Sequence, residues 1–225
     1  MPKFNKQFVG HEYPNDSLLQ QNVLYKYNSL GHRCKNVEDI DMNNYILFAG
    51  CSHTLGEGLN LEQTYPYLTA KNLNCDYYNL SMSASGIDVL FYNVMMWMAT
   101  YKKPKLLVLQ YPDHTRFSSI TYPPMVLPYG VWTTDNDAMD ILTKSEDKGV
   151  FAFRNLCYTQ LIDTLDVPKI KLVFGSTKAY DYCTKIERLD YAVDNLHYGA
   201  ETHISCADFV CDKYLNANFT STGTV

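Results

Sequence analysis

Short, mostly apolar segments alternate with amphipathic ones along this chain, and that alternation constrains the fold more than any other feature. Four short segments are predicted to be strands: 45–49, 76–80, 105–111 and 170–174. Three of them are apolar nearly throughout, which is typical of parallel strands that are buried on both faces. The pattern therefore predicts a central, mainly parallel sheet.

Amphipathic helices are predicted between and after these strands. The clearest follows Gly86, where apolar residues recur at the i, i+3, i+4, i+7 spacing as far as Met98. A helix capped by Thr64 should cover 65–73. Two further helices are predicted from apolar faces formed by Phe153, Leu156, Cys157, Leu161 and Leu165 in one and by Ile204, Ala207, Val210, Cys211 and Tyr214 in the other. Strands and helices in this order predict right-handed crossovers and a three-layer α/β/α sandwich.

The length of 225 residues and the hydrophobic content of 46% suit one domain. Residues 1–40 are polar and lack periodicity, so we expect an N-terminal arm there, followed by the main domain over 41–218 and a tail over 219–225. Within the domain, residues 112–149 combine prolines, polar residues and aromatic residues. This composition predicts a long insertion that lies over the functional site.

Composition argues against several classes of function. The net charge of −5 and the lack of a basic stripe argue against a nucleic-acid partner. The longest strongly apolar stretch, 89–98, is too short to span a membrane, and the start of the chain lacks the pattern of a signal peptide. We therefore expect a cytoplasmic or virion-associated protein without a membrane partner. Seven cysteines without a C-x-x-C pair predict reduced thiols, and we expect no metal and no cofactor.

Parallel sheets place their ligands at the carboxyl ends of strands, so chemistry is expected in the loops after Ala49, Leu80 and Tyr111. The first of these loops is G-C-S-H-T-L-G-E-G, residues 50–58. It holds Ser52 in a sharp turn between a strand and a helix. Such a turn exposes the hydroxyl and points backbone N–H groups toward a developing oxyanion.

Other chemistries suit this loop less well. No Gly-Lys-Ser/Thr sequence closes it, so it is not a phosphate-binding loop. It is not the G-x-S-x-G elbow of the α/β-hydrolases, because Thr54 occupies the second glycine position. Cys51 is an alternative nucleophile, but consecutive residues that leave a strand point to opposite faces, which favours Ser52. A serine that only caps the following segment is a further alternative.

A serine nucleophile requires a base, and the base requires an orienting carboxylate. Asp194 and His197 are three residues apart, so in a turn the carboxylate can hold one imidazole nitrogen while the other faces the serine. The same spacing also suits an ordinary surface pair at a helix start. The order of the motifs, with the serine turn after the first strand and D-x-x-H before the last helix, favours a catalytic triad of Ser52, His197 and Asp194.

With these two motifs in this order, the chain resembles the SGNH or GDSL hydrolase family. In that family a G-D-S block near the start supplies the nucleophile, and a D-x-x-H block near the end supplies the acid and the base. The likeness covers about residues 45–215 and implies a flavodoxin-like α/β/α fold. Residues 28–33, N-S-L-G-H-R, are similar to a segment that precedes the nucleophile block in many such proteins, including ones from bacterial viruses.

The resemblance also implies an oxyanion hole formed by the Ser52 N–H, a glycine N–H and an asparagine side chain. Residues 79–86 look like the second block of the family, with Ala84 at the glycine position. The backbone donor is retained if alanine adopts the dihedral angles that glycine has there.

The third block of the family corresponds to residues 110–116 of this chain, which contain no asparagine. His114 is our candidate for the missing donor, and Gln110 and Arg116 are alternatives. Loss of one such donor commonly lowers turnover by about 100- to 1000-fold. The resemblance therefore leaves the efficiency of catalysis open.

The implied reaction is hydrolysis of small acyl esters, such as O-acetyl groups on carbohydrate, through an acyl-enzyme on Ser52. Trp132 and Tyr111 are candidates for contact with a sugar ring. Two alternatives stay open. One is a non-catalytic module that binds a glycan or a protein, as in a virus particle, and the other is transfer of the acyl group to another hydroxyl. Assembly into an oligomer or a virion is a further expectation.

Overall fold

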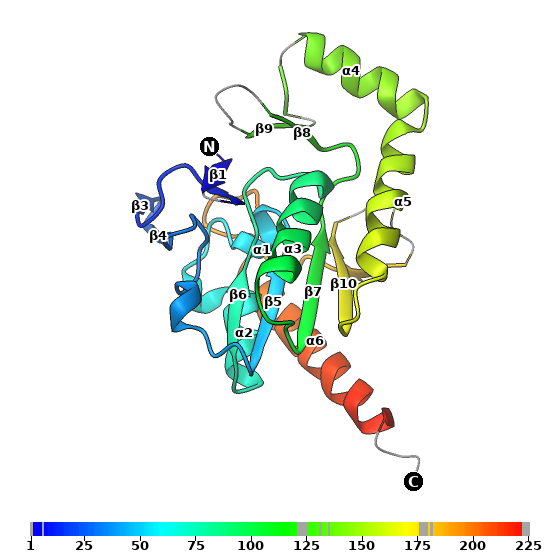
Figure 1. Cartoon of the computed structure of the whole chain (residues 1–225). Helices are drawn as coiled ribbons and strands as arrows, with labels where there is room; N and C mark the ends of the chain where they lie inside the picture. Colours follow the sequence, from blue (N-terminus) through cyan, green and yellow to red (C-terminus); the bar gives the residue numbers. More distant parts are fainter. Residues whose placement is uncertain are drawn as a thin grey trace.

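A five-stranded parallel sheet forms the centre of the described part of the molecule (Figure 1). The structure is a computed structural model that describes residues 2–5, 7–120, 126–130, 132–134, 136–175, 180 and 182–221. The strands are, in spatial order, β11 (Thr184–Ile186), β10 (Lys169–Phe174), β7 (Leu106–Tyr111), β5 (Tyr45–Ala49) and β6 (Asp76–Asn79). All neighbours in the sheet are parallel, as predicted. β11 was not predicted, because its three residues are too short to give a pattern.

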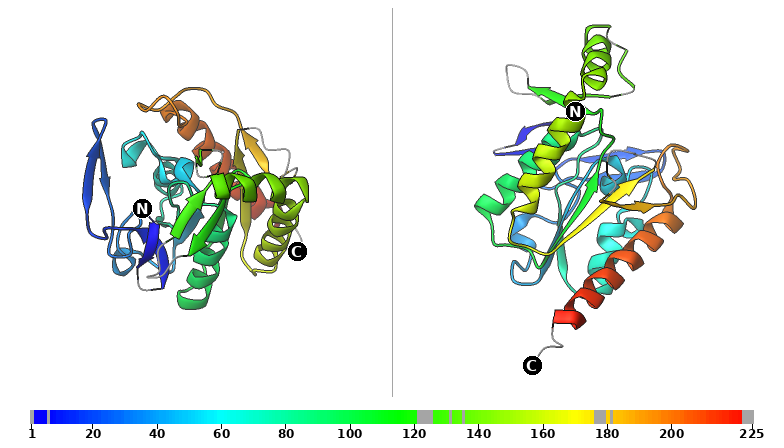
Figure 2. Two further views of the ribbon diagram at one scale, coloured as in Figure 1. Left: turned by 90° about the horizontal axis from the view of Figure 1, so that it is seen from above. Right: turned by 90° about the vertical axis from the view of Figure 1, so that its right-hand side faces the viewer.

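Helices cover both faces of this sheet and give the predicted three layers (Figure 2). α3 (Ile87–Thr100) and α5 (Val150–Asp163) lie on one face, whereas α2 (Tyr65–Asn72) and α6 (Ala200–Ser221) lie on the other. Alternate residues of the central strands pack into the two apolar layers, as the pleat of a strand requires. The sheet is therefore buried on both faces.

The strand order places the candidate nucleophile where the chain reverses direction across the sheet. Numbered along the chain, the core strands lie in the order 2-1-3-4-5, which is the flavodoxin-like order. Ligands bind beyond the carboxyl ends of the strands at such a switch point, which here lies between β5 and β7. Ser52 begins the short helix α1 (Ser52–Leu55) just after β5. The predicted fold class is thus confirmed, and Ser52 lies at the expected edge of the sheet.

The N-terminal arm forms two antiparallel hairpins instead of the irregular loops that its sequence suggested. β1 (Pro2–Asn5) pairs with β2 (Phe8–His11), and β3 (Ser17–Gln20) pairs with β4 (Val23–Lys26). The two residues between β3 and β4 both have positive φ, which suits a tight hairpin turn. A short 3-10 helix, η1 (Val37–Asp39), leads into the sheet. Several apolar side chains of the arm are buried, so it packs onto the main domain.

The long insertion carries secondary structure of its own. β8 (Phe117–Ile120) and β9 (Val126–Tyr129) form an antiparallel ribbon, and α4 (Asn136–Asp147) follows. In Figure 1, α4 extends beyond the carboxyl edge of the sheet before the chain turns back into α5. The rest of the insertion includes residues 121–125, 131 and 135, which lie outside the described residues.

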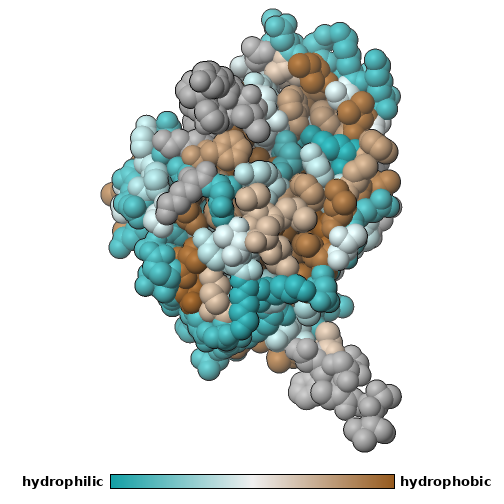
Figure 3. Space-filling view, in the orientation of Figure 1, coloured by the Kyte–Doolittle hydropathy of each residue, from teal (hydrophilic) through white to brown (hydrophobic). Residues whose placement is uncertain are grey.

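A helix was predicted over 153–165 and α5 covers 150–163, but three of the five residues of its predicted buried face are exposed. Phe153, Leu156 and Leu161 are 70%, 49% and 49% exposed. The buried positions are instead Phe151, Asn155, Thr159 and Ile162. Asn155 donates a hydrogen bond to the carbonyl oxygen of His114, so the buried face of α5 includes a polar contact that hydrophobicity alone does not predict. Figure 3 shows the resulting hydrophobic surface over α4 and α5.

The C-terminal helix differs from its prediction at one position. Ile204 is 51% exposed, and the buried face is formed by Cys206, Ala207 and Val210. α6 continues to Ser221, within the segment predicted to be a tail, and residues 222–225 lie outside the described residues. No helix in the described ranges is both long enough and apolar enough to cross a membrane.

The start of α2 is stabilised in a way that the sequence did not predict. Thr64 occupies the N-cap position, but its hydroxyl donates to the carbonyl oxygen of Leu61, in the 3-10 helix η2 (Leu61–Gln63). Instead, the backbone N–H of Tyr65 donates a hydrogen bond to His203 Nδ1 at 3.0 Å. A contact between α2 and α6 therefore replaces the expected side-chain cap.

Candidate functional site

The candidate nucleophile lies in a turn that one buried amide holds in place. Ser52 is 4% exposed and follows the N-cap residue Cys51. The side-chain oxygen of Gln110, on β7, accepts hydrogen bonds from the Cys51 N–H (2.9 Å), the Cys51 thiol (3.1 Å) and the Thr54 hydroxyl (3.2 Å). α1 ends at Gly56, whose φ of 79° favours glycine. Because the thiol is buried and bonded, the geometry favours Ser52 over Cys51 as the reactive group of the turn.

Asp194 and His197 make the contact that their spacing predicts. Asp194 Oδ2 lies 2.6 Å from His197 Nδ1, and Oδ1 accepts hydrogen bonds from the backbone N–H groups of Leu196 (2.9 Å) and His197 (3.0 Å). Burial opposes ionisation of Asp194, but these hydrogen bonds outweigh it and hold the pKa of the carboxyl below its usual value. The carboxylate favours the imidazole tautomer with its proton on Nδ1, which leaves Nε2 as the basic nitrogen.

The loop that carries Asp194 packs beside the nucleophile turn. The Val193 N–H donates to the carbonyl oxygen of Gly58 at 3.4 Å, and a Cβ atom on Gly58 would lie 2.6 Å from the Cβ of Ala192. The φ of Gly58, +76°, also disfavours any other residue. A glycine is therefore needed at this position for the two motifs to meet.

A second carboxylate, which the sequence analysis missed, lies on the other side of His197. Glu57 Oε2 is 3.2 Å from His197 Nε2. Across the described ranges, no hydrogen bond joins the Ser52 hydroxyl to His197, and Ser52 Oγ lies 4.0 Å from the sulfur of Cys51. The structure thus brings the Asp–His half of the predicted triad into contact and leaves the Ser–His half unjoined. One feature of the sequence could have identified Glu57 as a site residue, because it is the one acidic residue of the loop 50–58.

His53 packs between the nucleophile turn and the histidine loop. Its ring centroid lies 5.2 Å from that of His197 and 5.2 Å from that of Phe174, on which it stacks. Burial, together with the neighbouring charge of His197, lowers the pKa of His53 to about 3. A neutral imidazole at this position acts as packing that holds α1 close to the loop of His197.

The loop after β6 has the conformation expected of the second family block. Ala84 has a φ of 57°, in the left-handed region that favours glycine. The Ser85 hydroxyl and the Met82 N–H both donate to the carbonyl oxygen of Gly50, at 3.2 and 3.3 Å, which ties this loop to the nucleophile turn. Neither the Ser52 N–H nor the Ala84 N–H donates to another residue that the structure describes. Both groups are therefore available to hold an oxyanion.

Of the three alternatives for the missing asparagine, Gln110 is engaged elsewhere and His114 lies beside two carboxylates. The side-chain amide of Gln110 donates to the carbonyl oxygen of Tyr111 at 2.7 Å. The imidazole of His114, our first candidate, lies 4.0 Å from the Asp113 carboxylate and 3.8 Å from Glu146 on α4, and its buried Nδ1 has no hydrogen-bond partner among the described residues. This position directs His114 toward α4.

Arg116 is the third alternative, and it retains free donors. Its Nε and Nη1 are buried and have no hydrogen-bond partner in the described part of the chain. Its guanidinium lies 4.8 Å from the ring centroid of Trp132, and its charge contributes to the lowered pKa of His53. Arg116 is thus within electrostatic reach of the nucleophile helix.

The two aromatic residues expected to contact a sugar lie in different environments. Trp132 is 43% exposed and carries the Arg116 guanidinium on one ring face. Tyr111 is 1% exposed, and its ring packs against Tyr180 and Tyr182 at centroid distances of 5.0 and 6.1 Å. Because Tyr111 is part of the core, it is not accessible to a substrate.

Two neighbouring cavities open beside the candidate triad. The inner cavity, of about 310 Å³, lies between Glu57, Ser83 and Asp194 on one side and Gln20 and Gln21 on the other. The outer cavity, of about 640 Å³, shares Gln21 with it and continues past Gly58 and Val193.

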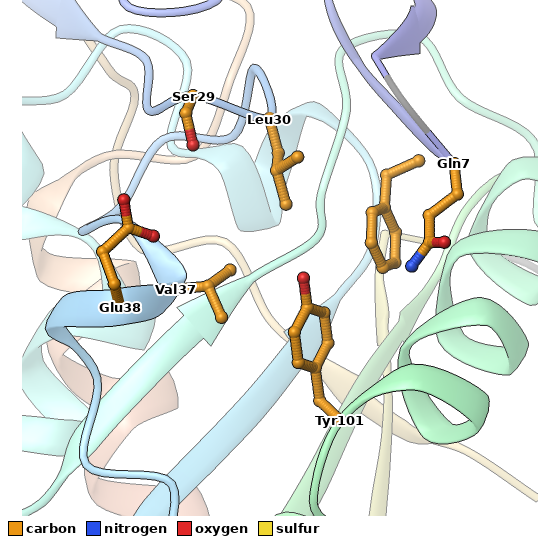
Figure 4. Close-up of a pocket in the computed structure, with 7 residues that line it drawn as sticks. Gln7, Ser29, Leu30, Val37, Glu38 and Tyr101 are labelled. Carbon is orange, nitrogen blue, oxygen red and sulfur yellow. The ribbon is translucent and has the colours of Figure 1, made fainter.

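A third cavity, of about 200 Å³, is lined by Gln7, Leu30, Glu38 and Tyr101, among others (Figure 4). Tyr101 follows the C-terminal end of α3, whereas the nucleophile turn lies near its N-terminal end. This cavity contains none of the candidate site residues.

Comparisons with known proteins bear on the fold. No protein-family model and no curated protein matches the sequence. Among solved structures, a carbohydrate esterase family 2 enzyme of Corynascus thermopiles (Myceliophthora fergusii) is similar, with a TM-score of 0.51, 14% identity, and coverage of 77% of this chain and 66% of that one. A family 2 carbohydrate esterase of Clostridium thermocellum, solved with cellohexaose, has a TM-score of 0.49, 13% identity, and coverage of 79% and 65%.

A lipolytic protein of the G-D-S-L family from Desulfitobacterium hafniense has a TM-score of 0.47 and 11% identity, with coverage of 76% of this chain and 99% of that one. This chain thus spans about two thirds of the length of the carbohydrate esterases it matches, and nearly the whole of the smaller protein. The strand order, the position of Ser52 after β5 and the similarity to the Corynascus thermopiles enzyme agree. The chain has the SGNH hydrolase fold, as that carbohydrate esterase does.

Proposed function

We propose that this chain is a serine esterase that hydrolyses small acyl esters, such as O-acetyl groups, carried by a carbohydrate. The observation that carries the proposal is the 2.6 Å contact between Asp194 and His197 beside the Ser52 turn, at the switch point of the sheet. A carboxylate, an imidazole and a serine in this order are the components of nucleophilic ester hydrolysis.

In the proposed reaction, Ser52 Oγ attacks the ester carbonyl carbon while His197 Nε2 accepts the hydroxyl proton. The tetrahedral intermediate then expels the alcohol, which takes this proton from His197, and the acyl group remains on Ser52. Water attacks the acyl-enzyme by the same route and releases the carboxylic acid. For the first step, the ring of His197 turns away from Glu57 and toward Ser52.

Three donors are proposed to hold the oxyanion. Two are the backbone N–H groups of Ser52 and Ala84, which have no other partner among the described residues. We assign the third to Arg116 in place of the family's asparagine, because its Nε and Nη1 are buried and unpaired and its charge reaches His53 on the nucleophile helix, whereas the unpaired Nδ1 of His114 lies beside the Asp113 carboxylate. A guanidinium in a partly buried site stabilises a developing negative charge more strongly than a neutral amide.

Two observations support a carbohydrate as the alcohol part of the ester. The enzyme of Corynascus thermopiles that shares this fold is described as a carbohydrate esterase with a carbohydrate-binding domain. In this chain, the inner cavity beside His197 is lined mainly by amide, hydroxyl and carboxylate groups, which suit sugar hydroxyls.

The test is to incubate the wild-type chain and its Ser52→Ala variant with p-nitrophenyl acetate and, separately, with a fluorophosphonate label. The wild type should release p-nitrophenol and take up the label, and Ser52→Ala should do neither. Ser17→Ala, in the exposed strand β3, is the matched control and should behave like the wild type. A folded wild type that neither turns over the ester nor takes up the label would show that the chain is not a serine esterase.

One observation favours a second candidate, a non-catalytic module that binds a glycan. His197 Nε2 contacts Glu57, and no hydrogen bond to Ser52 is seen among the described residues. If this is the working state of the site, the chain binds an oligosaccharide without hydrolysing its acetylated form. The labelling experiment separates the two candidates, because only an activated serine reacts with a fluorophosphonate.

A further inference from the structure

The β3–β4 hairpin forms one wall of the inner cavity, and Asp194, the one member of the candidate triad that lines this cavity, forms part of the other. Gln20, Gln21 and Tyr27 line the first wall, and Glu57 and Asp194 line the second. The volume of about 310 Å³ falls at the lower end of the range for small-molecule sites, about 300–1,000 Å³. The inner cavity is therefore suited to a single small ring or a group of similar size.

The wall of the inner cavity formed by the β3–β4 hairpin is fixed to the loop that follows the nucleophile. The Tyr25 hydroxyl accepts a hydrogen bond from the Gly58 N–H at 2.7 Å. Arg33 lies over the Tyr25 ring, at 4.3 Å from its centroid, and donates to the carbonyl oxygens of Gly56 and Leu59, at 2.7 Å each. Arg33 is 1% exposed, so these contacts are shielded from water. The hairpin thus keeps a defined position relative to the candidate triad.

The chemistry of the inner cavity favours a neutral polar ligand. Amide, hydroxyl and carboxylate groups satisfy the hydroxyls of a sugar, and a tyrosine ring can pack against its C–H face. A long apolar chain would exclude water from the oxygen lone pairs of Glu57 and Asp194 that His197 and the backbone leave unsatisfied, which is costly. Among the described residues that line the inner cavity there is no lysine or arginine, so nothing there compensates the charge of an acidic sugar.

The outer cavity provides room for more than one sugar. Gln21 lines both cavities, and the outer one continues along Gly58 and the loop of Val193. Tyr191, which is 53% exposed, lies along it. A ligand in the inner cavity can therefore extend along the surface as a chain.

We propose that the inner cavity binds the neutral sugar that carries the ester, and that the outer cavity binds its neighbours in a glycan chain. The inference rests on the proposed esterase function for its link to catalysis. It adds the β3–β4 hairpin as the element that determines specificity, through contacts from Gln20 and Gln21.

Binding is measured without hydrolysis by ligand-observed saturation-transfer NMR, with xylotetraose, cellotetraose and tetragalacturonic acid as probes of the whole chain. We expect at least one of the neutral probes to bind, and the acidic probe to bind about tenfold more weakly or not at all, because of repulsion by the cavity carboxylates. In the Gln20→Lys variant, the ratio of the affinity for the neutral probe to that for the acidic probe should fall about fivefold or more, since the lysine adds a positive charge to the cavity wall.

Leu19→Lys is the matched control. Leu19 is next to Gln20 on β3, is exposed, and does not line the inner cavity, so the same added charge should leave the preference unchanged. Equal effects of the two lysine variants, or failure of both neutral probes to bind, would overturn the inference.

Failure of the esterase proposal can be distinguished from failure of the glycan-binding inference, because the two give different combinations of activity and binding. A chain that binds a neutral probe but neither turns over p-nitrophenyl acetate nor takes up the fluorophosphonate has a glycan site without esterase chemistry. A chain that hydrolyses p-nitrophenyl acetate and binds neither neutral probe is an esterase whose alcohol part is not a neutral glycan.

Discussion

At the scale of single residues, His197 is held between two carboxylates whose effects on the proposed chemistry oppose each other. Asp194 contacts Nδ1 and favours the tautomer that a general base needs. Glu57 contacts Nε2, the nitrogen that would have to face Ser52. Catalysis then depends on how easily the imidazole leaves Glu57.

Glu57→Ala should separate these effects. Without the competing carboxylate, Nε2 is free to face Ser52, and we expect kcat for p-nitrophenyl acetate to rise about threefold, or ~0.6 kcal/mol. For an acetylated xylo-oligosaccharide, kcat/KM should fall, because the variant loses a hydrogen-bonding group in the inner cavity. Steady-state kinetics with both substrates provide the measurement. An equal loss on both would mean that Glu57 assists the chemistry itself.

Arg116→Met should lower kcat for p-nitrophenyl acetate by about 100-fold with little change in KM, as expected for the loss of an oxyanion donor. The matched control is Arg188→Met, which removes an exposed guanidinium that packs on Tyr191, and it should retain wild-type kinetics with this small substrate. If the two variants have the same kcat, the third donor is not Arg116.

Ala84→Gly should stabilise the fold slightly. The left-handed conformation of Ala84 costs about 1–2 kcal/mol relative to glycine, and the greater flexibility of glycine in the unfolded chain offsets about 0.4–1 kcal/mol of the gain. We expect the free energy of unfolding, measured with urea, to rise by about 0.5 kcal/mol. A lower value in the variant would contradict the assigned backbone conformation.

At the scale of elements, the N-terminal arm and the nucleophile loop form one unit through Arg33. Its guanidinium donates to the carbonyl oxygens of Leu55, Gly56 and Leu59 in a site almost closed to water. The arm is therefore part of the site, although its sequence lacks the periodicity of regular structure.

Arg33→Ala should lower the free energy of unfolding by about 3 kcal/mol, because it leaves buried carbonyl oxygens without donors. Lys35→Ala, which removes a surface ion pair with Asp76 from the same segment, should cost less than about 1 kcal/mol. Urea unfolding of both variants tests the difference. Similar losses would mean that Arg33 is no more important than a surface cation.

The elements that were predicted well are those whose signal is local. The apolar spacing of α3 and the three-residue spacing of Asp194 and His197 determine their own geometry, so both were found from the sequence. The buried face of α5 was wrong because the bond from Asn155 to the carbonyl of His114 depends on a loop about forty residues away.

The same limit applies to the site. Glu57 and Arg116 reach it through the conformations of their loops, and those conformations are fixed by tertiary contacts such as the packing of Gly58 against Ala192. Likewise, Tyr111 is the last residue of a strand, as predicted, but nothing local showed that its ring turns into the core.

At the scale of the whole molecule, the buried residues His32 and His203 and the half-buried His53 make stability depend on pH. Burial lowers the pKa of His32 to about 4, and the pKa values of His53 and His203 to about 3. In the unfolded chain these groups titrate near 6.5, so between pH 6.5 and about 4 the unfolded state binds more protons. The stability that they contribute is thus complete above pH 6.5 and is lost as the pH falls toward the folded values.

Thermal unfolding followed by circular dichroism should therefore show a lower Tm at pH 5 than at pH 7, with a loss on the order of 1–2 kcal/mol for each histidine. His203→Gln keeps a side-chain acceptor for the Tyr65 N–H and removes one titrating group, so the decrease in Tm between pH 7 and pH 5 should be smaller in this variant. A Tm that does not change between these pH values would contradict the neutral, buried state of these rings.

The last helix has a consequence for how this molecule can be attached to something else. α6 begins just after the loop of His197 and ends at Ser221, about 33 Å away along its axis, at the opposite end of the sheet (Figure 1). A support, a label or a fused partner joined beyond Ser221 would therefore sit behind the molecule and leave the inner cavity facing solution. A partner attached at β1, which contacts β9 on the insertion, would instead stand at the end of the molecule that holds the carboxyl ends of the strands (Figure 1). The end chosen for attachment thus determines which end of the sheet stays open to solution.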